Sequence, residues 1–366
     1  MGTDIATVSL DKYLTKKEQP LVICGPCSAE SEQQIMDTAH ALSEIPQVNI
    51  FRAGIWKPRT RPNGFEGVGD KGLPWMKRVK EETGLKVIVE VAYPQHVEAA
   101  LKHDIDMVWV GARTTTNPFL VQELADCLRG VDIPVFVKNP PHPDLGLWVG
   151  ALERMNAAGI QKLVAIHRGF YVHNQTSFRN PPSWEIPIEL KQIAPDLPII
   201  TDPSHICGNR DNLGFISQKA MDLEMDGLML ESHVNPSTAL TDADQQLRPE
   251  DIKHLLDHLT IRKNTNVYQK NQKLVELRNE LDRLDEQMID ILGKRLKVIE
   301  DIGLYKKEKN VTILQLKRWS EVVQDRLKTG AAHGINEEFL EKLLKILHEE
   351  SIRKQMIIMN VEKPNK

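Results

Sequence analysis

The sequence predicts an α/β fold, a (β/α)8 barrel, followed by an all-α helical domain. Through about residue 260, short apolar runs rich in β-branched residues alternate with amphipathic stretches, which is the pattern of repeated βα units. From Thr265 onward the strand-like runs stop and helical periodicity takes over. Residues that bind metals well also follow the ends of apolar runs that lie far apart in the sequence. A barrel of parallel strands would bring such residues together, because it collects all its strand ends at one face.

Eight apolar runs account for the predicted barrel, and eight is the number of strands that closes it. Several runs are apolar on both faces, as expected of strands buried between a barrel core and an outer ring of helices. In chain order the predicted strands are 21–27, 49–53, 86–92, 107–111, 134–139, 162–167, 198–202 and 227–231. Only about twenty residues precede the first of them, so we expect no N-terminal regulatory domain.

The periodicity after residue 265 predicts one long helix at 266–308 and two shorter ones at 316–328 and 336–358, the latter two separated by a Gly-containing turn at 330–334. At 1.5 Å per residue the long helix would extend roughly 60 Å, more than the diameter of a hundred-residue domain. We therefore expect it to pack against a second copy. Two interleaved heptad series predict its seam: Leu274, Leu281, Met288 and Ile302 with Arg295 between the last two, and Leu277, Leu284, Ile291 and Val298.

These patterns separate a barrel domain (1–262), a linker (263–269) and a helical domain (270–366). The formal net charge is −4, with 20 Lys and Arg against 17 Asp and Glu from Thr265 onward, and 27 against 34 before it. The net charge is +3 in the tail and −7 in the remainder, and neither value indicates the concentrated basic face that nucleic-acid binders usually carry. We expect no nucleic-acid partner.

The lack of a recognisable targeting signal and the small number of cysteines lead us to expect a cytoplasmic protein. No run approaches the roughly 18 to 20 apolar residues that span a bilayer, and the first residues show no secretory signal pattern. Four cysteines are too few for a disulfide scaffold. Cys24 and Cys27 form a C-x-x-C pair, but a redox pair would normally open a helix, and here Pro26 separates a strand residue from a loop residue. The redox interpretation is the weaker one.

The predicted metal ligands are Cys27, His205, Glu231 and Asp242. Each lies just past the end of an apolar run or in the loop that follows it. Taken alone, His205 is better explained as a capping or core histidine, and Glu231 as the partner of a lysine. Together, a thiolate, an imidazole and two carboxylates form a mixed site that suits divalent Mn, Fe, Co or Zn and discriminates poorly among them.

Basic residues follow the same strand ends. Singly, each is more often a solvated or salt-bridged side chain. Gathered at one face, they predict a site for an anionic, phosphorylated substrate, because Arg and Lys supply bidentate and point-charge contacts to phosphate and carboxylate. The residues are Arg52, Lys57, Arg59, Arg113, Lys138 and Arg168, with Thr60 in the same loop as Arg59 and Glu90 in the third run.

At these positions the sequence resembles a known family. The motifs GPCS, FRAG with KPRT, VGAR, VKNP, AIHRG, TDPSH and ESH, the last followed by Asp242, are similar to those of the 3-deoxy-D-arabino-heptulosonate 7-phosphate (DAHP) synthases, in the compact microbial subfamily. The resemblance covers nearly all of 20–260. KPRT favours this family over the related 3-deoxy-octulosonate 8-phosphate synthases, which use a five-carbon sugar phosphate. That enzyme, with a non-catalytic helical dimerisation or regulatory module, is the alternative.

The resemblance implies that phosphoenolpyruvate and erythrose 4-phosphate condense and release inorganic phosphate, with a divalent metal, Mn²⁺ by preference. Arg113 and Arg168 would hold the phosphate of phosphoenolpyruvate. Arg59 and Thr60 would grip the phosphate of the aldose.

The remaining family roles concern the reacting atoms. Arg52, Lys57 and Lys138 would face the carboxylate and the reacting carbons of the donor. The metal would polarise the aldehyde carbonyl, while carboxylates, with Glu90 counted among the catalytic residues, would steady positive charge on the donor. Lys138 is the candidate for proton transfer to the new alkoxide, and a metal-bound water is the rival donor.

Polar residues interrupt the apolar faces of the helical domain. From periodicity alone, a coiled-coil oligomerisation segment is the simpler interpretation. However, a charge at a seam position is costly unless it meets an anion, and in the last helix an apolar face continues into polar side chains. We expect these residues to converge on a polar pocket within a helical bundle. They are Arg278, Arg295, Lys306, Ser351 and Gln355.

Together with Asp285 and Arg318, these positions resemble the all-helical chorismate mutases over 266–360. The resemblance implies an intertwined homodimer that rearranges chorismate to prephenate. Arg278 of one subunit and Arg295 of the other would bind the two carboxylates of chorismate. Lys306 and Gln355 would donate to the ether oxygen, where negative charge grows as the C–O bond breaks. Arg318 and Ser351 complete the set of substrate-binding residues.

Two residues depart from the mutase pattern. Gln315 and Trp319 stand where the family usually has acidic residues near the hydroxyl group of the substrate. Either the hydroxyl is recognised differently here, or the domain is a weaker mutase.

The two activities on one chain also predict feedback. Without an N-terminal regulatory domain, inhibition must use another site, and by resemblance the helical domain binds a downstream metabolite. We expect prephenate or chorismate bound there to inhibit the barrel by restricting access to its C-terminal face.

Overall fold

The computed structural model describes residues 5–14, 19–57, 64–173, 177–262 and 272–360. Backbone contacts divide the chain into two compact units, Met1–Asn264 and Thr265–Lys366. Within the described ranges, all strands belong to the first unit, and the second is helical. The predicted linker at 263–269 lies outside the described residues, so its boundaries stay a prediction.

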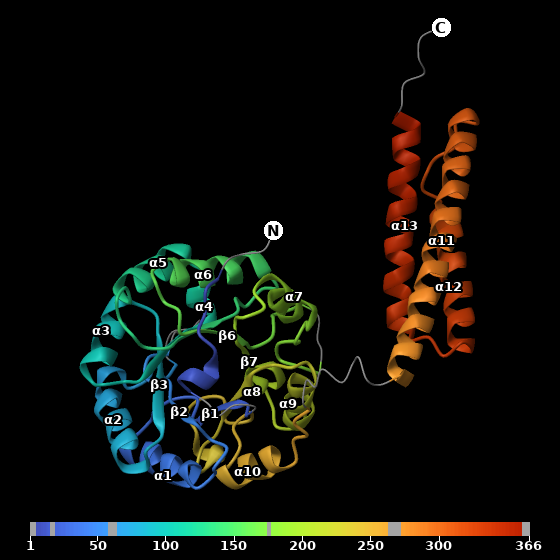
Figure 1. Ribbon diagram of the computed structural model, residues 1–366. Coiled ribbons are helices and arrows are strands. Elements are labelled where there is room, and N and C mark those ends of the chain that lie inside the picture. The colour runs from blue at the N-terminus through green and yellow to red at the C-terminus, as the bar shows by residue number, and fades with distance from the viewer. Residues whose placement is uncertain (1–4, 15–18, 58–63, 174–176, 263–271, 361–366) are drawn as a thin grey trace. The chain divides into compact units, whose positions relative to one another are not determined.

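The first unit is a closed barrel of eight parallel strands that pair in chain order (Figure 1). Pairing of β1 with β8 closes it, with Leu21 opposite Gly227 and Gly25 opposite Glu231. Each strand lies within one of the predicted runs, so the predicted barrel is confirmed. The strands are β1 Leu21–Gly25, β2 Ile50–Arg52, β3 Lys86–Val91, β4 Met107–Val110, β5 Val135–Lys138, β6 Leu163–His167, β7 Ile199–Thr201 and β8 Gly227–Glu231.

Successive side chains of each strand point to opposite sides, which gives the barrel two apolar layers. In β4, Met107 and Trp109 belong to the cluster inside the barrel, whereas Val108 and Val110 pack in the layer between strands and helices. Leu10, in a short 3-10 helix before β1, joins the inner cluster. The N-terminal segment therefore covers one end of the barrel.

Helices surround the strands (Figure 1). The first of them, α1, begins after Ser31, whose hydroxyl accepts a hydrogen bond from the backbone N–H of Gln34 at 3.2 Å. It buries an apolar face against the strands, as the other long barrel helices do. The helices are α1 Glu32–Ser43, α2 Gly72–Thr83, α3 Pro94–Lys102, α4 Ala112–Thr115, α5 Pro118–Cys127, α6 Leu145–Ala157, α7 Glu185–Ile193, α8 Pro203–Cys207, α9 Leu213–Asp222 and α10 Pro249–Asp257.

The second unit consists of α11 (Gln272–Glu308), α12 (Leu316–Ala332) and α13 (Glu337–Asn360). Helix α13 packs against both α11 and α12. The long helix is confirmed through residue 308, and its predicted start at 266–271 lies outside the described residues. None of the helices in the described ranges is long and apolar enough to cross a membrane.

The predicted turn at 330–334 is wrong at its start. Gly330 is a buried residue of α12, which continues to Ala332. A Cβ at Gly330 would lie 2.1 Å from Leu340 Cδ2, so glycine here lets α13 approach closely. The chain reverses instead at Gly334, whose φ of 71° is a left-handed conformation typical of a helix end.

Candidate functional site

A polar cavity of about 120 Å³ lies at the carboxyl ends of the strands. The lining residues come from loops and ends of strands throughout the barrel, as its closure in chain order requires. The residues that line the cavity are Lys57, Glu90, Ala112, Arg113, Lys138, Arg168, Arg179, His205 and Asp242. All of these except Ala112 and Arg179 are among the predicted site residues.

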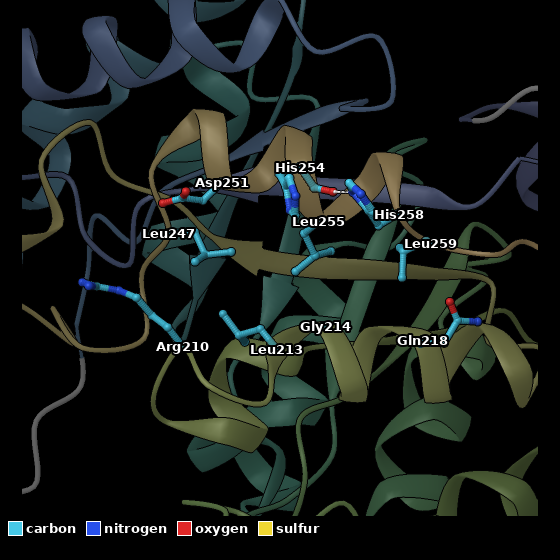
Figure 2. Close-up of a pocket in the computed structure, with 10 residues that line it drawn as sticks. All are labelled: Arg210, Leu213, Gly214, Gln218, Leu247, Asp251, His254, Leu255, His258 and Leu259. Carbon is cyan, nitrogen blue, oxygen red and sulfur yellow. Dashed lines mark hydrogen bonds between the residues drawn. The ribbon is translucent and has the colours of Figure 1, made fainter.

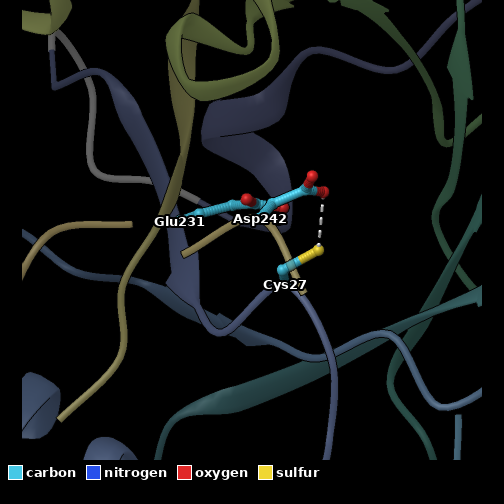
Figure 3. A group of neighbouring side chains, drawn as sticks. All are labelled: Cys27, Glu231 and Asp242. Atoms are coloured by element: carbon cyan, nitrogen blue, oxygen red, sulfur yellow. Dashed lines mark hydrogen bonds between the residues drawn. The ribbon is translucent and has the colours of Figure 1, made fainter. Parts of the chain in front are cut away.

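Three of the four predicted metal ligands converge at this end. The ligand atoms of Cys27, Glu231 and Asp242 all lie within 4.8 Å of one another (Figure 3). The thiol of Cys27 donates to Asp242 Oδ2 at 3.2 Å. The fourth, His205, is adjacent to this cluster, with its Nε2 3.7 Å from Glu231 Oε1.

The residue that orients His205 is Asp202, which the sequence interpretation did not include. Its Oδ1 accepts the backbone N–H of His205 at 3.1 Å and so caps α8, while its Oδ2 lies 2.8 Å from His205 Nδ1. Nε2 is thereby left on the side of Glu231. Burial lowers the pKa of His205, which favours the neutral imidazole that binds metals.

The chemistry of this donor set fits a divalent transition ion. Burial, followed by the nearby charge of Glu231, raises the pKa of Cys27 to about 12 although Lys57 Nζ lies 3.2 Å from the sulfur, so a thiolate here needs more positive charge than Lys57 supplies. One sulfur, one imidazole nitrogen and two carboxylates are together typical of such an ion. Asp242 has a φ of 47°, unusual for a residue other than glycine, and Arg179 Nη1 holds its carboxylate at 2.9 Å.

Arg52 is almost completely buried beside these carboxylates. Its Nη2 lies 3.2 Å from Glu231 Oε1, and its guanidinium stands 5.0 Å from the centre of the Trp109 ring. Nε and Nη1 are buried and have no acceptor among the residues that the structure describes. Because buried donors without acceptors are costly, an anionic ligand fits beside Arg52. Lys57 is close by and donates to the Cys27 carbonyl at 2.8 Å.

Lys138 is also buried, and its ammonium donates to Asp202 Oδ2 at 2.8 Å. Asp202 therefore links a predicted catalytic lysine to a predicted metal ligand. Burial alone would raise the pKa of Asp202, but the neighbouring His205, which is hydrogen-bonded to it, and the ammonium of Lys138 hold it well below its ordinary value. The signal in the sequence was its position directly before Pro203, where helix-capping aspartates occur.

Arg168 also lines the cavity, as do Arg113 and Arg179. Its Nη1 donates to Asn180 Oδ1 at 2.9 Å. Burial, opposed by Asp202 and reinforced by the charges of Arg179 and Arg113, lowers the pKa of Arg168 to about 10. Such repulsion among cations is relieved when a multivalent anion binds between them. Arg179 follows no strand directly, and no sequence signal identified it.

Glu90 reaches the cavity because of Gly111, which directly follows the neighbouring strand β4. A Cβ at Gly111 would lie 2.0 Å from Glu90 Oε1, so the glycine leaves the space that this carboxylate occupies. Of the remaining predicted barrel residues, Arg59 and Thr60 lie outside the described residues.

In the helical unit, the structure brings together Arg295, Ser351 and Gln355. Arg295 Nη1 and Ser351 Oγ both donate to the Leu347 carbonyl, at 3.4 and 2.6 Å. Gln355 Nε2 donates to the Ser351 carbonyl at 3.2 Å, and its buried Oε1 has no donor within the described ranges. Lys306 donates to the Ile313 carbonyl at 2.7 Å, and burial lowers its pKa.

Two other predicted residues do not join this group. Arg278 is exposed on α11, 17 residues before Arg295, which corresponds to roughly 25 Å along a helix. Arg318 is exposed on α12, with its Nη1 3.5 Å from Glu321 Oε2. The ring of Trp319, by contrast, stacks on His348 with centroids 3.9 Å apart and an angle of 12° between planes. His348 was not among the predicted residues.

A second hollow lies outside the barrel between α9 and α10, with a volume of about 520 Å³ (Figure 2). Leucines such as Leu213 and Leu255 form much of its wall. Two of its polar residues are engaged elsewhere: Arg210 Nε donates to the Gln246 carbonyl at 2.7 Å, and Gln218 Nε2 to the Thr260 carbonyl at 3.1 Å. None of the predicted site residues lines it.

Comparisons with known proteins match both units. Residues 6–266 match the family model described as the DAHP synthetase I family, and residues 277–356 match chorismate mutase type II. The chain is 30% identical over 238 residues to phospho-2-dehydro-3-deoxyheptonate aldolase of Thermotoga maritima, covering 65% of this chain and 68% of that one. A crystal structure of the Thermotoga maritima enzyme superimposes with a TM-score of 0.61 at 28% identity, over 69% of this chain and 71% of that chain. A 2-dehydro-3-deoxyphosphooctonate aldolase of Nitratidesulfovibrio vulgaris is 24% identical over 261 residues, covering 65% of this chain and 90% of that one.

Proposed function

The chain belongs to the DAHP synthetase I family and carries a chorismate mutase type II domain, and from this premise we propose how its residues perform two reactions. It is a bifunctional enzyme of the shikimate pathway. The barrel condenses phosphoenolpyruvate with erythrose 4-phosphate to DAHP and inorganic phosphate, and the helical domain converts chorismate to prephenate. The observation that carries the barrel assignment is the group of cationic side chains that line one cavity, next to a ligand set of sulfur, imidazole nitrogen and carboxylate oxygen.

The two anionic groups of phosphoenolpyruvate bind to different cationic side chains. Arg113 and Arg168 take the phosphate, since their mutual repulsion is relieved by a dianion. Arg52, whose Nε and Nη1 lack acceptors among the described residues, takes the carboxylate together with Lys57. The donor is thereby fixed with its enol carbon turned toward the aldehyde. Arg59 and Thr60 are proposed to bind the phosphate of erythrose 4-phosphate.

Cys27, His205, Glu231 and Asp242 would hold the divalent metal, for which we propose Mn²⁺, with Fe²⁺, Co²⁺ and Zn²⁺ as substitutes. The ion supplies Lewis-acid polarisation of the aldehyde carbonyl when bound. As the enol carbon forms the new C–C bond, Glu90 faces the positive charge that develops on the donor. Lys138, positioned by its 2.8 Å contact with Asp202, gives a proton to the new alkoxide, and water then adds to the donor carbon as phosphate leaves.

The aldose specificity tests the barrel assignment. With phosphoenolpyruvate and Mn²⁺, the purified chain is expected to release phosphate with erythrose 4-phosphate at least about 100 times faster than with arabinose 5-phosphate, because a misplaced phosphate loses its paired contacts. Phosphate release and product mass measure both reactions. Product from arabinose 5-phosphate alone would assign the barrel to octulosonate synthesis instead.

For the mutase, we propose that Arg295, Lys306 and Gln355 of one chain bind chorismate together with Arg278 of a second chain. Arg278 and Arg295 project from one straight helix, roughly 25 Å apart, so they cannot contact a single small substrate within one copy. Apolar residues along α11 are also exposed in the single chain, which supports a homodimer formed through this helix. They are Leu277, Leu281, Leu284, Met288, Ile291, Val298 and Ile302.

Feedback between the two activities is a further proposal for this chain. Prephenate or chorismate binding to the helical domain is expected to lower DAHP formation several-fold, by favouring a less active arrangement of the protein. DAHP formation is measured against prephenate concentration for the full chain and for a chain ending at Arg262. A response confined to the full chain supports the coupling. Equal inhibition of both chains, or no inhibition of the full chain by either ligand, contradicts it.

A further inference from the structure

Helices α12 and α13 carry a pair of stacked rings, one of which, His348, is not among the mutase residues described above. Trp319 of α12 and His348 of α13 lie almost parallel, with centroids 3.9 Å apart. Both side chains are half-buried. Stacking against a flat indole restricts the imidazole to a narrow range of orientations. His348 is therefore held in one orientation before any ligand binds.

The position of His348 places it in the mutase site. It precedes Ser351 by three residues and Gln355 by seven on α13, a spacing that puts all three on one helix face. Arg295 Nη1 donates to the carbonyl of Leu347, the residue next to His348. The charges of Arg295 and Lys306 are both close enough to act on the imidazole.

The charge state of His348 suits a particular kind of ligand group. Burial and the charges of Arg295 and Lys306 lower its pKa, against the opposing charge of Glu349. A neutral imidazole has one nitrogen that accepts a hydrogen bond and one that donates. Among the described residues, none forms a hydrogen bond with either ring nitrogen of His348. The ring thus offers an uncharged hydrogen-bonding site between groups that are positively charged.

One polar group of chorismate has no partner among the mutase residues proposed above. The two carboxylates of chorismate pair with arginines, and its ether oxygen with Lys306 and Gln355. The remaining group is a hydroxyl, which needs a neutral acceptor or donor rather than a third cation. We propose that His348, clamped by Trp319, binds the substrate hydroxyl and determines the preference of this domain for the hydroxylated substrate. This inference rests on the proposed mutase function.

Replacing His348 tests the proposal through the hydroxyl itself. His348→Leu keeps an apolar contact for Trp319 but removes both ring nitrogens. Rearrangement of chorismate and of an analogue with hydrogen in place of the hydroxyl is measured with the full-length chain. The wild type is expected to favour chorismate in kcat/KM by roughly 10- to 100-fold, since a buried hydrogen-bonding group is left unpaired with the analogue. His348→Leu loses most of that preference and leaves kcat/KM for the analogue nearly unchanged.

Matched variants separate recognition from packing. His348→Gln, which keeps a hydrogen-bonding amide, recovers part of the preference. His333→Leu, at the exposed histidine just after α12, leaves kcat/KM unchanged for both substrates. The helical content of each variant and its rate of DAHP formation are measured to check that the chain is folded. If His348→Leu lowers kcat/KM equally for chorismate and for the analogue, or lowers it for neither, His348 does not recognise the hydroxyl and the inference is overturned. Absence of any rearrangement by the wild type overturns the mutase function itself.

Discussion

Removing the metal from the purified protein is expected to lower DAHP formation by about 10³-fold or more, and Mn²⁺ to restore it. Lewis-acid polarisation is worth several kcal/mol of transition-state stabilisation, and about 1.4 kcal/mol corresponds to each tenfold in rate. Cys27→Ala is expected to have a similar effect at low metal concentration, because it removes the sulfur of the proposed ligand set. Phosphate release after chelation and after titration with Mn²⁺ measures both results.

A second cysteine provides the control for Cys27→Ala. Cys24 is equally buried, but its side chain packs in the layer between strands and helices. Cys24→Ala should cost about 1 kcal/mol of stability through a small cavity and leave metal affinity unchanged. In Co²⁺-loaded protein, the thiolate-to-cobalt absorption should vanish in Cys27→Ala and persist in Cys24→Ala. Full activity of chelated wild type, or unchanged metal affinity of Cys27→Ala, would contradict the proposed centre.

The barrel was predictable because its signals are local and repeated. Most strands contain β-branched residues and several are apolar on both faces, and the alternation of such runs with amphipathic stretches repeats eight times. Once eight parallel strands close in order, residues after their ends must gather, so the positions of Cys27, Lys138 and Glu231 follow from the fold. The sequence could therefore predict most of the cavity lining before any distance was known.

The parts that escaped prediction depend on tertiary contacts without a periodic signal. Asp202 looks in sequence like a helix cap, and only the structure shows that its second oxygen links Lys138 with His205. Arg179 enters the cavity from a long loop. The stacking of Trp319 on His348 joins α12 and α13, whereas the heptad series describe α11 alone. Gly330 was mistaken for a turn because close packing of α12 on α13 selects glycine as strongly as a turn does.

Arg295→Ala is expected to reduce chorismate rearrangement by about 10³-fold, while DAHP formation and the helical content stay unchanged. Arg295 is half-buried within the helical unit and stands beside Ser351 and Gln355, so alanine removes a positive charge from a site that must bind a dianion. Loss of chorismate absorbance measures the rate. Arg326→Ala is the matched control, since Arg326 is exposed on α12 and pairs only with its neighbour Asp325 among the described residues.

Combining two inactive variants tests whether each mutase site uses two chains. If Arg278 of one copy completes the site that contains Arg295 of the other, Arg278→Ala and Arg295→Ala chains should each be inactive alone. A heterodimer of the two has one site with both arginines and one site with neither. After unfolding and refolding as an equal mixture, half of the dimers are mixed, and roughly one quarter of wild-type activity should return. Recovery requires exchange of chains, so it should be absent when the folded variants are combined without exchange. If the refolded mixture stays inactive while gel filtration shows mixed dimers, each site lies within one chain, and Arg278 has another role.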